Sequence, residues 1–111
     1  MKLLFKLLIS ITMLIVAANA QTIKVGTNAT YPPFEFVNEQ NQITGFDMDL
    51  MAEIAKKVGF KFEIVNISFD SLIPALKAGK IDIIAAAMSA TPERLKAVDF
   101  SKPYYHTMNL F

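Results

Sequence analysis

The chain has 111 residues, of which 53% are hydrophobic, and it carries 11 basic and 10 acidic side chains, a net charge of +1. This length is enough for one small domain or for part of a larger protein, and the balanced charge argues against nucleic acid as a partner. The sequence contains no cysteine, which excludes disulfides, thiol catalysis and a lipid anchor on an N-terminal cysteine within these residues.

The first twenty residues have the order of a secretory signal peptide. Lys2 and Lys6 precede an apolar run over residues 7–18, and a small-residue sequence follows at 18–20. We therefore expect export to the periplasm, with cleavage after Ala20. The alternative is an uncleaved membrane anchor, for which the run is short, because a span needs about 20 apolar residues. Cleavage would leave nine basic and ten acidic residues, a net charge of −1.

After this segment, stretches with the spacing of strands alternate with stretches that have the spacing of helices. In chain order we expect a strand at 22–26, a fixed loop at 27–34, a hairpin at 35–45, a helix at 46–59, a strand at 61–67, a helix at 68–80, a buried strand at 81–87, a short helix at 91–98 and an extended segment at 98–111. This alternation predicts an α/β fold with a mostly parallel sheet, right-handed crossovers and flanking helices.

The loops that follow the predicted strands hold the candidate binding residues, because ligands of open parallel sheets bind beyond the carboxyl ends of the strands. Arg94 is the most informative of them. A cation in the first turn of a helix opposes the helix dipole and calls for a nearby anion. Two interpretations stay open: either Glu93 or Asp99 neutralises Arg94 on a solvated face, or the carboxylate of a ligand binds there.

Other residues of these loops also have a structural interpretation beside the functional one. Ser89 is either a turn hydroxyl or a ligand donor, and the three alanines at 85–87 either pack tightly or leave room for a ligand. Tyr31 and Phe69 come from two different loops, and they either belong to the core or flank a ligand side chain. Asn28 either forms a turn or contacts the ligand.

Several polar residues predict no chemistry of their own. His106 is the single histidine and has no partner nearby in the sequence, so we interpret it as structural or exposed. Asp47 and Asp49 fit charges at the positive end of the helix at 46–59, and not an acid–base pair. No spacing matches a metal site, a phosphate loop or a nucleophile triad. We expect no cofactor, no metal and no catalysis.

Three stretches together resemble the family 3 bacterial extracellular solute-binding proteins, which deliver amino acids to ABC importers. They read GTNATYPPFEF, GFDMDLMAEIAKKVG and FDSLIPALKAGKIDIIAAAMSATPERLKAVDFSKPYY, and together they extend over most of residues 23–105. The resemblance implies a lobe of the periplasmic binding protein type II kind, without the second lobe. Residues 21–111 would be the N-terminal lobe, ending in the hinge strand.

The resemblance also implies roles for the residues that follow the third predicted strand. Arg94 would pair with the α-carboxylate of the ligand, helped by Ser89, and the carbonyl of Ala87 would accept from the α-ammonium group. Met88 lies between these two loop residues and is counted with the site. The acidic partner that the family provides for the α-ammonium would belong to the second lobe.

The same resemblance bears on the ligand and on the function. Tyr31 and Phe69 would flank the ligand side chain. Asn28 stands where relatives for cationic ligands often carry aspartate, which favours a neutral or polar amino acid. We therefore expect a monomeric receptor that delivers an amino acid to a membrane ABC permease. The alternatives are a ligand-sensing input domain of a larger receptor or wall enzyme, and an enzyme similar to cyclohexadienyl dehydratases.

Overall fold

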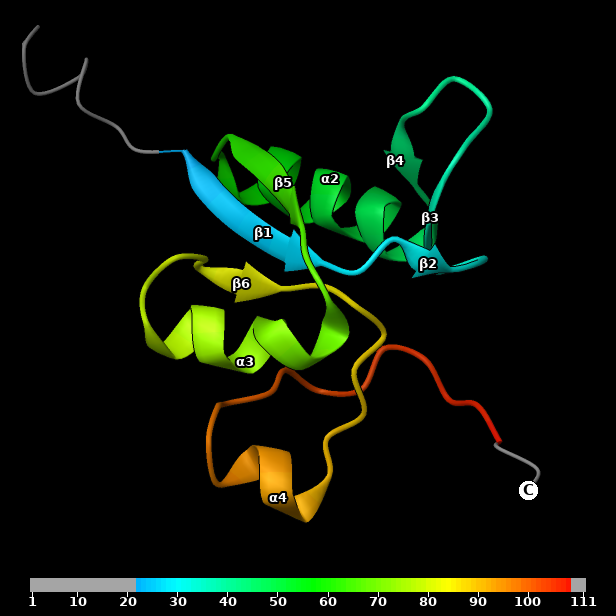
Figure 1. Cartoon of the computed structure of the whole chain (residues 1–111). Helices are drawn as coiled ribbons and strands as arrows, with labels where there is room; N and C mark the ends of the chain where they lie inside the picture. The colour runs from blue at the N-terminus through cyan, green and yellow to red at the C-terminus, as the bar shows by residue number, and fades with distance from the viewer. Residues whose placement is uncertain (1–21, 109–111) are drawn as a thin grey trace, which may run out of the picture.

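A three-stranded parallel sheet forms the centre of the computed structural model, which describes residues 22–108 (Figure 1). The strands lie in the order β5-β1-β6 and are β1 (Ile23–Thr27), β5 (Phe62–Asn66) and β6 (Ile83–Ile84). β1 pairs with both neighbours in parallel, with Val25 opposite Ile64 on one side and Ile83 on the other. The predicted α/β lobe with a parallel sheet is therefore confirmed.

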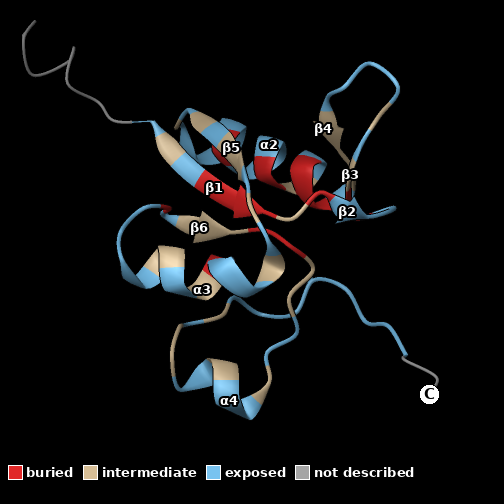
Figure 2. Cartoon of the chain, in the orientation of Figure 1, coloured by how far each residue is buried: buried red, intermediate tan, exposed pale blue. Residues whose placement is uncertain are grey.

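Two helices cover opposite faces of this sheet, which gives three layers (Figure 1). Helix α2 (Phe46–Val58) packs on one face and α3 (Phe69–Lys77) on the other. The core toward α2 contains Val25, Met48, Met51 and Ala85, and the core toward α3 contains Leu72, Ile81 and Ala86. Figure 2 shows buried residues on β1, α2 and α3, and on both sides of β6.

A second, antiparallel sheet precedes α2. It has the order β2-β3-β4 and consists of β2 (Thr30–Tyr31), β3 (Glu35–Val37) and β4 (Ile43–Thr44). The hairpin expected at 35–45 is confirmed by the pairing of β3 with β4. The loop expected at 27–34 differs in one respect, because Thr30 and Tyr31 pair with Phe36 and Glu35 as a short strand.

The backbone of the preceding turn caps the first turn of α2 in place of a side chain. The N–H of Phe46 donates to the Pro33 carbonyl and the N–H of Asp47 donates to the Phe34 carbonyl, both at 2.9 Å. These bonds satisfy amide groups that a helix leaves unpaired at its start. Gly45 makes the approach possible, because it adopts φ 128° and a Cβ there would collide with the Phe34 carbonyl oxygen.

The later part of the chain departs from the prediction at two places. The buried strand expected at 81–87 is shorter as β6, Ile83–Ile84, although the N–H groups of Asp82 and Ala85 also donate to β1, and the backbone adopts φ 49° at Ala87. The extended segment after α4 (Pro92–Leu95) forms no strand within residues 99–108, and the structure describes no neighbour for it to pair with there.

The predicted signal peptide lies outside the described residues. None of the helices described within 22–108 combines the length and the apolar character that crossing a membrane requires.

Candidate functional site

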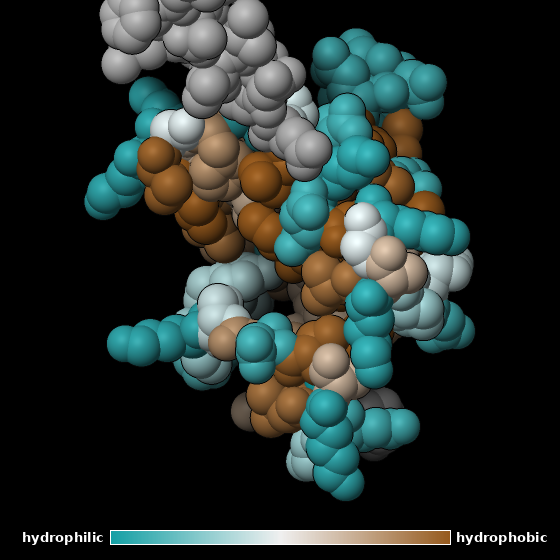
Figure 3. All heavy atoms as spheres, turned by 90° about the vertical axis from the view of Figure 1, so that its left-hand side faces the viewer, coloured by the Kyte–Doolittle hydropathy of each residue, from teal (hydrophilic) through white to brown (hydrophobic). Residues whose placement is uncertain are grey.

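The candidate residues gather at one edge of the parallel sheet. β1, β5 and β6 all end there, and the loops that follow them meet beside the segment after α4 (Figure 1). The opposite side of the molecule, at the starts of the strands, shows a central band of hydrophobic side chains flanked by hydrophilic ones (Figure 3). The polar groups expected to bind a ligand are thus concentrated at the carboxyl edge, as the rule for open parallel sheets predicts.

Arg94 lies against the loops of two strands and not against an acidic neighbour. Its Nη1 donates to the Ser89 carbonyl at 3.0 Å, and its Cζ lies 5.2 Å from the centre of the Phe69 ring. Among the contacts described within residues 22–108, none pairs Arg94 with Glu93 or Asp99. The half-buried guanidinium therefore keeps donors for another acceptor, which is the geometry that an anionic ligand would use.

The start of α4 positions this arginine. Thr91 is the N-cap, and its hydroxyl oxygen accepts from the Arg94 backbone N–H at 3.2 Å, with Pro92 as the first helical residue. The Thr91 N–H in turn donates to the Ser89 carbonyl at 3.0 Å. One carbonyl thus receives bonds from both the cap and the guanidinium, so the 89–94 turn forms a single hydrogen-bonded unit.

The three alanines after β6 have different environments. Ala85 belongs to the core toward α2 and Ala86 to the core toward α3, so the packing interpretation holds for both. Ala87 is half-buried and adopts a positive φ, which L residues other than asparagine and aspartate rarely do. Met88 packs beside the α3 core, and Ser89 is exposed. Of the three alanines, only Ala87 lies outside the two cores.

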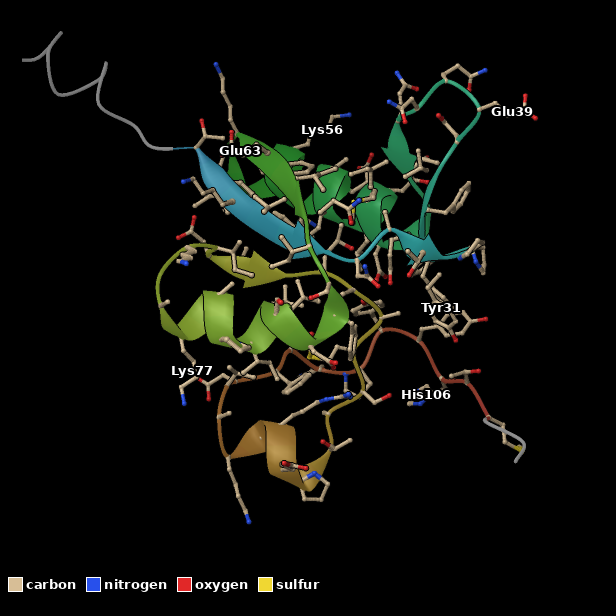
Figure 4. The ribbon with its side chains drawn as sticks, viewed as in Figure 1. Tyr31, Glu39, Lys56, Glu63, Lys77 and His106 are labelled. Atoms are coloured by element: carbon tan, nitrogen blue, oxygen red, sulfur yellow. The ribbon has the colours of Figure 1, made fainter. Side chains whose placement is uncertain are left out.

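Asn28 and the two predicted aromatic residues are all at this edge, with different contacts. The Asn28 side-chain oxygen accepts from the Thr30 hydroxyl at 2.8 Å, which is a turn contact. Tyr31 remains 48% exposed and stacks on Phe34 at 5.3 Å between ring centres (Figure 4). One face of each ring is covered, that of Phe69 by Arg94 and that of Tyr31 by Phe34, and Tyr31 is the more exposed of the two residues.

An aromatic group that the sequence did not predict joins the segment after α4 to this edge. Tyr105 meets the Phe34 ring at 4.9 Å, edge to face, and Tyr104 stacks on Phe46 at 6.1 Å. His106 is exposed on the same segment (Figure 4), as one of its two interpretations predicted. Contacts of aromatic side chains, and not backbone pairing between strands, thus hold the segment after α4 against the lobe.

Asp47 lies in the first turn of α2, as a helix-end charge should, but its burial was not predicted. Its side chain is 0% exposed, because the docking of the α2 start against the turn at 33–34 buries the first helical turn. One carboxylate oxygen accepts from the Ala87 N–H at 2.6 Å and the other accepts from the Tyr104 hydroxyl at 2.9 Å. Asp49, two residues later, is exposed as expected.

Glu35 is a second buried carboxyl group beside Asp47. It is 1% exposed, and its Oε2 has no hydrogen-bond partner among the described residues. Burial, together with a hydrogen bond to Asp47 and its negative charge, raises the pKa of Glu35 from 4.5 to about 8. Glu35 is therefore mostly protonated at neutral pH. No sequence signal marked this residue, because it lies between Phe34 and Phe36 in a short strand whose two faces have no clear alternation.

This buried proton predicts a pH dependence of stability. The unfolded chain loses the Glu35 proton near pH 4.5 whereas the folded chain keeps it to about pH 8. The folded state then binds more protons, so the free energy of unfolding falls by about 1.4 kcal/mol per pH unit between these values. We expect Glu35→Gln to remove this fall, measured by urea denaturation at pH 5, 7 and 9. Glu39→Gln, at the exposed hairpin tip (Figure 4), is the control and should keep the wild-type slope.

Within residues 22–108 no group of three or more metal-ligating side chains comes together. The site as described consists of a guanidinium, backbone groups of the 87–89 loop and aromatic rings. Such a set can bind a small molecule that carries a carboxylate.

Comparison with known proteins identifies related sequences over almost all of the described chain. Residues 23–111 match the family model of bacterial extracellular solute-binding proteins, family 3. A probable histidine-binding protein of Campylobacter jejuni is 58% identical over 90 residues, which cover 81% of this chain and 35% of the relative. A putative ABC transporter arginine-binding protein 2 of Escherichia coli is 45% identical, over 86% of this chain and 39% of the relative. The chain thus spans about a third of the length of these curated relatives.

Solved structures agree with the fold and with its extent. The arginine-bound domain 1 of the T. maritima arginine-binding protein is 50% identical with a TM-score of 0.74, over 76% of this chain and 67% of that one. An ancestral arginine-binding protein bound to arginine is 54% identical with the same TM-score, over 76% of this chain and 37% of that one. These relatives are named as binding proteins and not as enzymes, and the described lobe matches domain 1 of the T. maritima protein.

Proposed function

Because the chain belongs to the family 3 bacterial extracellular solute-binding proteins, we propose that it forms the first lobe of a receptor for a basic amino acid, arginine or histidine. The receptor would deliver this ligand to a membrane ABC importer. The relatives that are named periplasmic or extracellular support export to the periplasm, with residues 1–20 as the signal peptide. The proposal concerns a binding protein without catalysis, and the second half of its site would come from a second lobe.

The observation that carries the proposal is the position of Arg94. Its guanidinium is held by Phe69 and the Ser89 carbonyl and has no carboxylate partner among the described residues. A ligand α-carboxylate placed between Arg94 and the backbone N–H and hydroxyl of Ser89 would complete the charge pair. The Ala87 carbonyl, at the end of the strained turn after β6, would accept from the ligand α-ammonium.

We propose a ligand with a basic side chain, in place of the neutral or polar side chain that Asn28 led us to expect. The relatives described above are named for arginine or histidine and give no support to a neutral ligand. The argument from Asn28 was weak because its oxygen is engaged by the Thr30 hydroxyl, so the position need not contact a cation directly. The half-exposed face of Tyr31 provides another attraction, since aromatic faces bind guanidinium and imidazolium groups.

The ligand class is tested by titrating the full chain with arginine, histidine, glutamine and alanine in a calorimeter. We expect arginine and histidine to bind, and alanine to bind at least ~10-fold more weakly. Glutamine is included because an ancestral arginine-binding protein has also been crystallised with it. A chain that binds alanine as tightly as arginine would contradict the basic-ligand proposal while leaving the binding site in place.

The role of Tyr31 has a matched pair of substitutions. Tyr31→Leu removes the aromatic face, and a cation–π contact of about 1 kcal/mol predicts a ~5-fold loss of arginine affinity. Tyr31→Phe keeps the ring and should bind arginine as the wild type does. Because a lost aromatic face affects a cationic ligand more than a small neutral one, the affinity for alanine should change less than the affinity for arginine.

A further inference from the structure

Asp47 joins three segments that are far apart in the sequence. From the first turn of α2 its carboxylate accepts from Ala87, 40 residues later, and from Tyr104, 57 residues later. The residue is completely buried, and the positive end of the helix favours its negative charge. A buried carboxylate with charge-assisted bonds on both oxygens fixes the positions of the groups that it binds.

The hydrogen bond from Ala87 to Asp47 is made at a residue whose backbone conformation is unfavourable. Ala87 has a positive φ, a conformation that is unfavourable for alanine and persists only where its surroundings impose it. The N–H of this residue points into the lobe toward Asp47. Its direction determines the path of the next two residues, Met88 and Ser89, which lead to the turn that holds Arg94.

We infer that Asp47 is a positioning residue for ligand binding, which sets the backbone of the 87–89 loop and couples it through Tyr104 to the segment after α4. The inference rests on the proposed function, because the path of the loop matters for affinity only if the ligand lies on it. Asp47 does not touch the ligand in this account. It acts through the Ala87 peptide, whose carbonyl would face the α-ammonium group.

Glu35 is the second buried carboxyl group of this cluster, and it lies beside Asp47. Asp47 on α2 and Tyr104 on the following segment are the titratable groups that face it, and both influence or share its buried environment. Burial and the nearby carboxyl groups also raise the pKa of Tyr104, so its hydroxyl stays a donor to Asp47. While Glu35 keeps its proton it can donate to Asp47. Once the pH exceeds about 8, two negative charges meet beneath the loop, and the bond to Ala87 is weakened.

The inference is tested with three variants of the full chain, each titrated with arginine at pH 7 after its thermal melt has been recorded. Asp47→Ala removes both bonds and should lower the affinity at least ~10-fold. Asp47→Asn keeps one acceptor oxygen and should recover part of the loss. Tyr104→Phe keeps the ring and removes a single bond, with an expected loss of ~3-fold.

The pH profile separates positioning from a purely structural role. Arginine affinity of the wild type should fall as the pH rises from 7 to 9. Glu35→Gln, which stays neutral and can still donate, should make that fall smaller, and the remaining fall comes from deprotonation of the ligand's own α-ammonium group. If Asp47→Ala does not fold, the arginine affinities of Asp47→Asn and Tyr104→Phe test the inference. Folded Asp47 and Tyr104 variants with wild-type affinity would overturn the inference, whereas wild-type affinity of Arg94→Ala would overturn the proposed function instead.

Discussion

Arg94→Ala should reduce the affinity for arginine by about 100-fold or more. Truncating one member of a largely desolvated, hydrogen-bonded charge pair costs about 2–5 kcal/mol, because the other charge is left without its partner. The same substitution removes only one side-chain hydrogen bond and one cation–π contact from the free chain, so its melting temperature should change little. Calorimetric titration of folded protein measures the affinity directly.

Two further variants show whether charge alone explains this loss. Arg94→Lys keeps the charge but loses the planar fork and the contact with the Phe69 ring, so we expect an intermediate loss of ~10-fold. Lys96→Ala removes an exposed basic residue two positions later and should bind as the wild type does. Equal losses for Arg94→Ala and Lys96→Ala would mean that only the net charge of α4 matters, and would refute a specific carboxylate contact.

Gly45→Ala should destabilise the fold by about 3 kcal/mol or more. A Cβ at this position would collide with the Phe34 carbonyl oxygen and would lie 2.8 Å from the Pro33 oxygen, and φ 128° is a region that alanine avoids. To relieve this, the start of α2 must move away and lose the backbone bonds from Phe46 and Asp47. Urea denaturation followed by circular dichroism gives the free energy of unfolding.

Gly59→Ala is the matched control for this effect. Gly59 also has a positive φ, 91°, but nothing lies within 4 Å of a Cβ built there. Its substitution carries only the backbone cost of about 1–2 kcal/mol for the left-handed conformation. Comparable destabilisation by the two variants would show that close packing at Gly45 contributes nothing. Loss of arginine binding by Gly45→Ala should accompany its instability, because the docked helix carries Asp47.

The parts of the fold that depend on local periodicity were predictable from the sequence. The apolar stripe and terminal Gly59 of α2, the cap and Pro92 of α4, and the alternation of strands and helices all appear as expected. The meeting of the candidate loops followed as well, because the carboxyl ends of parallel strands must lie at one edge. Arg94 was found by its unfavourable place in a helix dipole, and its contacts confirm that it is not neutralised by the acids of its own helix.

The parts that depend on distant contacts were not predictable. Nothing in the local pattern around Asp47 distinguishes it from the exposed Asp49, since its burial results from the docking of α2 on another loop. Its partners Ala87 and Tyr104 are 40 and 57 residues away. The positive φ of Ala87, whose N–H donates to Asp47, likewise has no signal in the local sequence. Local patterns therefore identify candidate loop residues, but not the buried side chain that joins their segments.

A crystal structure of the full chain grown with arginine would examine the central claim most directly. The account predicts the α-carboxylate of the ligand within hydrogen-bonding distance of the Arg94 guanidinium, its α-ammonium at the Ala87 carbonyl, and its side chain against the face of Tyr31. Arginine bound elsewhere on the lobe, or bound at this edge with its carboxylate turned away from Arg94, would contradict it.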